Sequence, residues 1–137
     1  MSQAFALDAR LAGDTDPIAS LPLSDLLLAR DARFPWLILV PRRADMAEII
    51  DLAPDDRGAL LDEIVVASEA LRTVTGCDKL NVAALGNMVR QLHVHVIARF
   101  TTDPAWPGPI WGRGEAVAYE PGVRDKLAGR IRDLLPD

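Results

Sequence analysis

Three short apolar runs near the start of the chain predict β-strands. They span residues 18–21, 25–29 and 36–40, and polar or proline residues separate them. The run 36–40 is apolar throughout and lies between Pro35 and Pro41, which is typical of a strand covered on both faces. Residues 31–33 predict a hairpin turn between the second and third strands. The first fifteen residues predict only a short strand or a turn of helix.

Helical periodicity follows over residues 54–75. Acidic residues Asp55 and Asp56 suit the first turn of this helix, and Gly76 suits its end. A second amphipathic helix is expected from about Pro121 to the C-terminus. The apolar positions that set these periods are Leu60, Leu61, Ile64, Ala67, Leu71 and Val74 in the first helix, and Val123, Leu127, Ile131, Leu134 and Leu135 in the second.

Two more strands, at residues 78–85 and 91–100, are predicted on either side of a turn at Gly86 and Asn87. Residues 102–112 contain too much proline and glycine for regular structure. Together the elements predict an α+β fold, with a mainly antiparallel sheet of about five strands, the long helix packed on it and a C-terminal helix. We expect a single domain over residues 1–137, with its core at about 17–100 and a Pro/Trp-rich segment and helix at 101–137.

Composition narrows the class of protein. The 137 residues suit one compact domain, and one cysteine, Cys77, excludes a disulfide framework and a cysteine-only metal site. A net charge of −5 argues against binding of long nucleic acid. No apolar run reaches the length of a membrane span, and Asp8 and Arg10 fall where a secretory signal needs apolar residues. A cytoplasmic protein is the prediction.

The candidate chemistry lies in the only two histidines, His93 and His95. Strand alternation puts Gln91, His93 and His95 on one face of the strand at 91–100, opposite an apolar face. Three interpretations are open: a hydrogen-bonded surface pair, two metal ligands, or a catalytic base or nucleophile. The metal interpretation needs a third ligand, and neither another histidine nor a second thiol exists. We therefore expect no metal and no cofactor.

Charge around the pair favours the catalytic interpretation. Between residues 79 and 102 the chain has three basic residues, Lys79, Arg90 and Arg99, and no acidic residue. A positive environment attracts an anion. A neutral imidazole is a nucleophile toward phosphorus, and the resulting bond is labile to water. Phosphoryl or nucleotidyl transfer through histidine is the hypothesis that follows.

The seven residues from Gln91 to Ile97 resemble the histidine triad (HIT) motif, His-φ-His-φ-His-φ-φ with φ apolar, with glutamine in the first place. The resemblance covers about residues 20–100, because the strand at 36–41, the long helix, the strand at Asn81 and the Gly86-Asn87 turn keep the family's order. The stretch from Trp106 to Trp111 resembles a bacterial branch of the family. It can cover a site or pack on its own sheet, and packing is the interpretation we favour.

The family resemblance implies a nucleotide hydrolase or nucleotidyl transferase that attacks the α-phosphorus of dinucleoside polyphosphates, phosphoramidates or nucleotide sugars. By that resemblance His93 is the nucleophile, and His95 binds phosphate oxygens. Asn81 and Asn87 match amide positions near the ribose and phosphate. Trp36 and Arg90 complete the predicted substrate-binding residues, and Gln91 completes the catalytic ones. A homodimer and a nucleotide or dinucleotide substrate are also implied.

Two positions depart from the family pattern. Gln91 replaces the first histidine of the motif, and Trp36 replaces a fourth histidine that many members keep. Glutamine donates and accepts hydrogen bonds but delivers no proton near neutral pH. Two function classes remain: an enzyme that acts through His93, and a catalytically weak or inactive protein that binds or senses nucleotides. A metalloenzyme using His93 and His95 is a third, more distant hypothesis.

Overall fold

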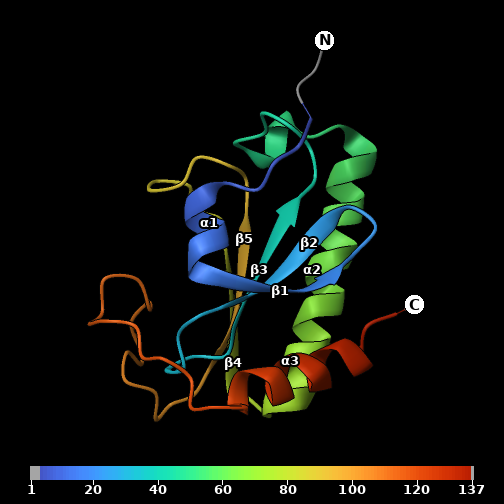
Figure 1. Ribbon diagram of the computed structural model, residues 1–137. Coiled ribbons are helices and arrows are strands. Elements are labelled where there is room, and N and C mark those ends of the chain that lie inside the picture. Colours follow the sequence, from blue (N-terminus) through green and yellow to red (C-terminus); the bar gives the residue numbers. More distant parts are fainter. Residues whose placement is uncertain (1–3, 137) are drawn as a thin grey trace.

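A five-stranded antiparallel sheet organises the computed structural model, which describes residues 4–136 (Figure 1). The strand order β1-β2-β3-β5-β4 inserts β5 between β3 and β4, and every neighbouring pair is antiparallel. The elements are α1 (Ala9–Asp14), β1 (Thr15–Ser20), β2 (Ser24–Ala29), β3 (Trp36–Pro41), the 3₁₀ turn η1 (Ile49–Asp51), α2 (Pro54–Thr75), β4 (Lys79–Ala83), β5 (Val94–Arg99) and α3 (Val123–Asp133). The predicted α+β class with a five-stranded antiparallel sheet is confirmed.

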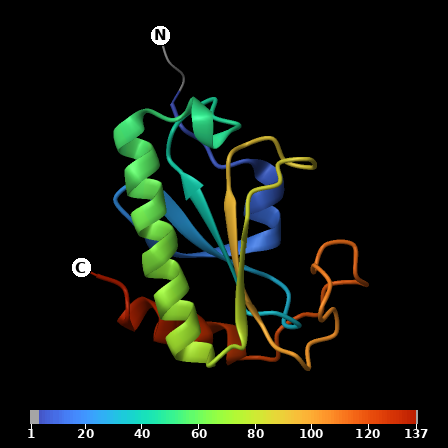
Figure 2. The same cartoon turned by 180° about the vertical axis from the view of Figure 1, so that it is seen from behind.

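The two faces of the sheet are covered differently, because alternate residues of each strand point to opposite sides. The long helix α2 packs on one face, and α1 lies against the other (Figures 1 and 2). The side of α2 holds the larger core, which includes Leu26, Leu28, Leu37, Leu39, Val94, Val96, Leu60, Ala67 and Leu71. The side of α1 holds a smaller core and leaves room for a cavity.

The helix α2 has the bounds predicted from the sequence. Pro54 occupies its first turn, where the missing N–H has no helical partner to lose. Asp55 and Asp56 also lie in the first turn, near the positive end of the helix dipole. The helix ends at Gly76, whose φ of 64° is in the left-handed region that favours glycine.

Three predicted strands differ in extent from the structure. β1 begins at Thr15 rather than at residue 18, and its register shifts between Pro17 and Ala19. This strand is at the edge of the sheet, where proline is tolerated. The strand predicted at 78–85 is shorter, at Lys79–Ala83. The strand predicted at 91–100 begins only at Val94, because the N–H of Leu92 bonds the carbonyl of Met46 outside the sheet.

Residues 102–112 contain no helix or strand, as predicted, yet they are held firmly. The Asp103 carboxylate accepts backbone N–H groups of Phe100, Ala105 and Trp106 and thereby closes the turn. Ala105 and Ile110 are buried beside Ile97 of β5. None of the helices in the described part of the chain has the length and apolar character needed to cross a bilayer.

Candidate active site

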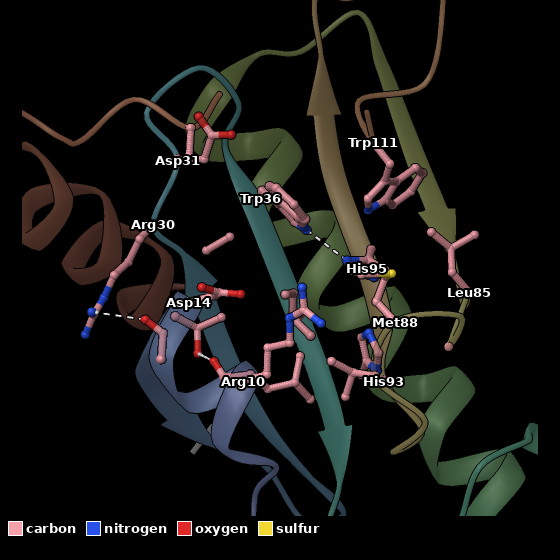
Figure 3. Close-up of a pocket in the computed structure, with 18 of the residues that line it drawn as sticks. Arg10, Asp14, Arg30, Asp31, Trp36, Leu85, Met88, His93, His95 and Trp111 are labelled. Carbon is pink, nitrogen blue, oxygen red and sulfur yellow. Dashed lines mark hydrogen bonds between the residues drawn. The ribbon is translucent and has the colours of Figure 1, made fainter. Parts of the chain in front are cut away.

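A cavity of about 630 Å³ opens on the α1 side of the sheet and contains both histidines (Figure 3). Its lining comes from α1, strands β2 and β3, the turn after β2, the loop at 85–89, the start of β5 and Trp111. The lining residues include Arg10, Asp14, Arg30, Asp31, Trp36, Leu85, Asn87, Met88, His93, His95 and Trp111. Charged, amide and aromatic groups therefore meet around one space.

The two histidines lie together, as strand alternation predicts. Their ring centroids are 4.9 Å apart with an interplanar angle of 73°, although His93 precedes the first residue of β5. His93 is 6% exposed and His95 is 5% exposed. The pair is therefore a buried element of the cavity wall, which excludes the hydrogen-bonded surface pair.

The ring of His93 is oriented by the backbone. Its Nδ1 is 2.6 Å from the carbonyl oxygen of Gln91. A carbonyl oxygen only accepts hydrogen bonds, so Nδ1 carries the proton of the neutral ring. The other nitrogen, Nε2, then holds a free lone pair, which is the form that a histidine nucleophile requires.

The ring of His95 is in the opposite tautomer. The indole Nε1 of Trp36 donates to its Nδ1 over 2.9 Å, so the neutral ring carries its proton on Nε2. Burial, with a smaller contribution from the charge of His93, lowers the pKa of His95 to about 4. His95 therefore stays neutral near pH 7 and offers an N–H donor. The pair thus presents one acceptor and one donor nitrogen.

The low pKa of His95 makes stability depend on pH. Since the unfolded chain protonates this ring near pH 6.5 and the folded chain only near pH 4, the unfolded state binds more protons between these values. The free energy of unfolding should therefore fall as the pH drops from 6.5 to 4, by about 3 kcal/mol from this ring. Denaturant unfolding at several pH values, compared with a His95→Gln variant, measures the contribution. Equal pH slopes in the two proteins contradict it.

Aromatic and apolar side chains form another wall of the cavity. The ring of Trp111 lies 5.1 Å from that of His95 at 72° and 6.5 Å from that of Trp36 at 88°. Leu85 and Met88 face the same space from the 85–89 loop. Such surfaces suit a planar base. Trp111 therefore both packs on the sheet and lines the cavity, so the packing interpretation describes only part of its position.

The side chain of Gln91 is already engaged. Its Oε1 accepts the backbone N–H of Asp8 over 2.9 Å, and its Nε2 donates to the carbonyl of Ala6 over 2.8 Å. Gln91 lines a neighbouring cavity of about 260 Å³ rather than the one that holds both histidines. The prediction that Gln91 shares one strand face with both histidines is wrong, because its amide bonds the backbone of residues 6 and 8 and β5 begins only at Val94. Its catalytic role stays a prediction.

The other predicted substrate-binding residues are divided. Asn87 and Trp36 line the main cavity. Asn81 does not line it, because its Oδ1 accepts from Nη1 of Arg99 over 2.8 Å. Arg90 is exposed and also lies outside the lining. Binding roles for Asn81 and Arg90 therefore gain no geometric support from the position of the cavity.

The charges near the histidines come from residues that the sequence did not single out. Of the three expected cations, Arg99 is buried against Asp103, and Lys79 and Arg90 do not line the cavity. Arg10 and Arg30 line it instead. No local pattern marks Arg10, since α1 is six residues long and its place depends on contacts with residues more than 80 positions away.

The described residues provide no set of ligands for a metal ion. Within residues 4–136, no three histidine, cysteine, aspartate or glutamate side chains converge in an arrangement that can hold a metal ion. His93 and His95 also direct one nitrogen each to a protein partner. The metal interpretation therefore lacks the third ligand that it needs.

Comparisons with known proteins agree with this geometry. Residues 12–102 match the model of the HIT domain. The chain is 48% identical to a histidine triad protein from Bradyrhizobium japonicum, with a TM-score of 0.96 over 98% of this chain and 100% of that chain. A histidine triad protein from Sinorhizobium meliloti is 48% identical, with a TM-score of 0.93 over 96% of this chain and 97% of that one.

A histidine triad protein from Marinobacter aquaeolei is 44% identical, with a TM-score of 0.93 over 97% of each chain. No curated protein matches the sequence. The solved structures are thus similar to this chain over nearly its whole length.

Proposed function

The chain belongs to the HIT domain family, and from this membership we propose that it cleaves a nucleotide at the α-phosphorus through a nucleotidyl adduct on His93. Family membership supports a nucleotide-binding or hydrolase-type protein. The observation that carries the finer proposal is the hydrogen bond from His93 Nδ1–H to the Gln91 carbonyl. Because this bond keeps the proton on Nδ1, the lone pair of Nε2 is free to act as a nucleophile.

The first chemical step forms a bond from His93 Nε2 to the α-phosphorus. The bond from phosphorus to the leaving group breaks, and its electron pair departs with the leaving atom. The imidazole gains positive charge in this step, and the Gln91 carbonyl, which accepts the Nδ1–H, stabilises it. The buried position of His93 fixes the ring for this attack.

The second step returns the enzyme to its starting state. A water oxygen bonds to phosphorus, the bond from Nε2 to phosphorus breaks, and its electron pair returns to His93. One proton of the water is released to solvent, and a nucleoside monophosphate leaves. In both steps the Nε2–H of His95, the tautomer that the Trp36 bond supports, donates to a phosphoryl oxygen and stabilises the charge that develops there.

Trp36 acts through His95, and its replacement separates this role from packing. A Trp36→Phe variant keeps an aromatic ring but loses the donor to Nδ1, so Nδ1 competes with Nε2 for the proton. We expect kcat to fall about 10-fold, the value of one lost orienting hydrogen bond. Nitrogen NMR of His95 should show a mixed tautomer.

A Trp111→Phe variant is the matched control, because it shrinks the other ring beside His95 without removing a hydrogen bond to it. It should leave the His95 tautomer unchanged. If Trp36→Phe also leaves the tautomer unchanged, the positioning role is wrong.

The proposed function is tested by mass spectrometry of the intact protein. The protein is mixed with adenosine and guanosine phosphoramidates, dinucleoside polyphosphates and nucleotide sugars, quenched with time and compared with release of nucleoside monophosphate. A transient adduct that maps to His93 supports the mechanism and identifies the substrate class. Release of monophosphate without any adduct on His93 contradicts it.

A nucleotide-binding or sensing protein is the second candidate, favoured by the engaged amide of Gln91. This side chain cannot deliver a proton, and both of its ends bond to the backbone. Binding of nucleotide without adduct or monophosphate supports this second candidate. A homodimer and a cytoplasmic location stay predictions that accompany either candidate.

A further inference from the structure

Among the cations that line the cavity, Arg10 has no side-chain partner within the described residues 4–136. The guanidinium of Arg10 makes no hydrogen bond or ion pair with any residue of the described range 4–136, whereas Arg30 pairs with Asp16 and Gly13. Figure 3 shows the Arg10 side chain entering the cavity from α1, with its guanidinium between Asp14 and the two histidines. A charged group in this place is available to a ligand.

Gln91 fixes the segment that carries Arg10. The oxygen of its amide bonds the backbone of Asp8, and the nitrogen bonds the backbone of Ala6. These two residues lead directly into α1. The carboxylate of Asp8 in turn accepts the backbone N–H of Arg10 over 2.8 Å. Leu11, the next residue, is 5% exposed and packs in the smaller core. The direction of Arg10 is thus set by the residue that stands where the motif expects its first histidine.

We propose that Arg10 binds the anionic leaving group of a nucleotide phosphoanhydride, and that Gln91 is the positioning residue that holds Arg10 in the cavity. This inference rests on the proposed function and narrows its substrate class to phosphoanhydrides. It also gives the glutamine a role: where the motif expects its first histidine, Gln91 holds the segment that brings the positive charge of Arg10 into the cavity.

The chemistry of the leaving group explains the choice. In a phosphoanhydride the P–O bond breaks and the departing phosphate takes the electron pair as an anion, which needs no proton. In a phosphoramidate the P–N bond breaks, and the departing amine needs a proton that the Gln91 amide cannot supply. A guanidinium stabilises negative charge through its N–H donors without transferring a proton.

Asp31 does not cancel the charge of Arg10. Its carboxylate bonds Arg33 over 2.8 Å and accepts the backbone N–H of Arg33 and Val117, so it is committed to the turn after β2. Asp14 lies one helical turn after Arg10, on the wall farther from the histidines (Figure 3). The guanidinium is therefore the charged group of α1 placed toward His93 and His95.

The experiment compares Arg10→Met with wild type on two substrates that share an adenylyl group. Diadenosine tetraphosphate has an anionic leaving group, and adenosine 5′-phosphoramidate has a neutral one. We expect kcat/KM for the tetraphosphate to fall about 10- to 100-fold, the range of a lost charge-assisted hydrogen bond, and the phosphoramidate to change less than about threefold. Arg57→Met, an exposed arginine on α2 across the sheet, is the matched control.

Gln91 is tested by coupling to Arg10. A Gln91→Ala variant should show the same selective fall in kcat/KM for the tetraphosphate as Arg10→Met. The double variant Gln91→Ala/Arg10→Met should then lose little more kcat/KM than either single variant. If Gln91 had only a structural role, Gln91→Ala would lower kcat/KM equally for both substrates, and this loss would add to the loss from Arg10→Met. Additive losses, or equal losses on both substrates, overturn the positioning role. Thermal unfolding of each variant checks that it is folded.

Failure of this inference differs from failure of the proposed function. Suppose that wild type cleaves both substrates, and that Arg10→Met either leaves both kcat/KM values unchanged or lowers both by the same factor. Only the role of Arg10 is then overturned. If wild type forms no adduct on His93 and cleaves neither substrate, the proposed function fails and the inference fails with it.

Discussion

Replacement of His93 by alanine is expected to lower kcat by about 10³-fold or more, the range seen when an essential nucleophile is removed. The reason is specific to this ring, because its Nδ1–H is bonded to the Gln91 carbonyl and only Nε2 is free to attack. His95 cannot substitute for it, since Trp36 fixes the proton of that ring on Nε2. Steady-state rates of monophosphate release measure the loss.

Nucleotide affinity separates loss of chemistry from loss of the site. The walls formed by Trp36, Trp111 and Met88 are unchanged by His93→Ala, so titration calorimetry with a nucleoside monophosphate should give a Kd close to that of wild type. A His93→Gly variant adds a second check, because free imidazole can occupy the vacated space and restore part of the rate. Turnover at the wild-type rate in His93→Ala rules out the adduct mechanism.

Much of the fold follows from local pattern. The bounds of α2 could be predicted because Pro54, the acidic first turn and Gly76 are signals within the helix itself. The start of β5 could not, because it depends on pairing with β3 and β4, which reach only Leu39 and Ala83. The bond from Leu92 to Met46 then takes the preceding residues out of the sheet.

In the candidate site, too, the features set by local sequence pattern could be predicted, and those set by distant contacts could not. The pairing of His93 and His95 follows from alternation over two residues, and the structure places their rings together. The places of Gln91 and Arg10 depend on hydrogen bonds that span 83 and 85 positions of the chain. No local period encodes such contacts, and residues near the N-terminus carried no functional signal for that reason.

Asn81 and Arg99 show how a chemically suggestive residue can be structural. Arg99 is 1% exposed, and its guanidinium bonds the Asp103 carboxylate at both oxygens, the Asn81 amide oxygen and the Gly108 carbonyl. The rings of Phe34 and Trp106 each lie 5.7 Å from it. The sequence predicts that the positive charge of Arg99 helps to bind an anion, but in the structure this charge is buried and bonded to protein groups.

Replacement of Arg99 by methionine is expected to lower the free energy of unfolding by about 3–5 kcal/mol, the cost of removing one partner of a buried ion pair. The hydrogen bond from Arg99, ahead of opposing burial and smaller backbone contributions, lowers the pKa of Asp103 to about 2. Loss of Arg99 therefore removes the largest contribution that stabilises this buried carboxylate. Denaturant unfolding of the wild type and the variant at pH 7 measures the difference.

A double variant identifies the buried charge as the cause. Arg99→Met combined with Asp103→Asn removes both charges, so it should recover part of the stability lost by Arg99→Met alone. Because Arg99 also anchors the Gly108 carbonyl, the single variant should loosen the segment that carries Trp111 and change its fluorescence. A loss below about 1 kcal/mol, the level of an exposed ion pair, contradicts the buried-pair account. A double variant less stable than Arg99→Met instead assigns the effect to lost backbone contacts of Asp103.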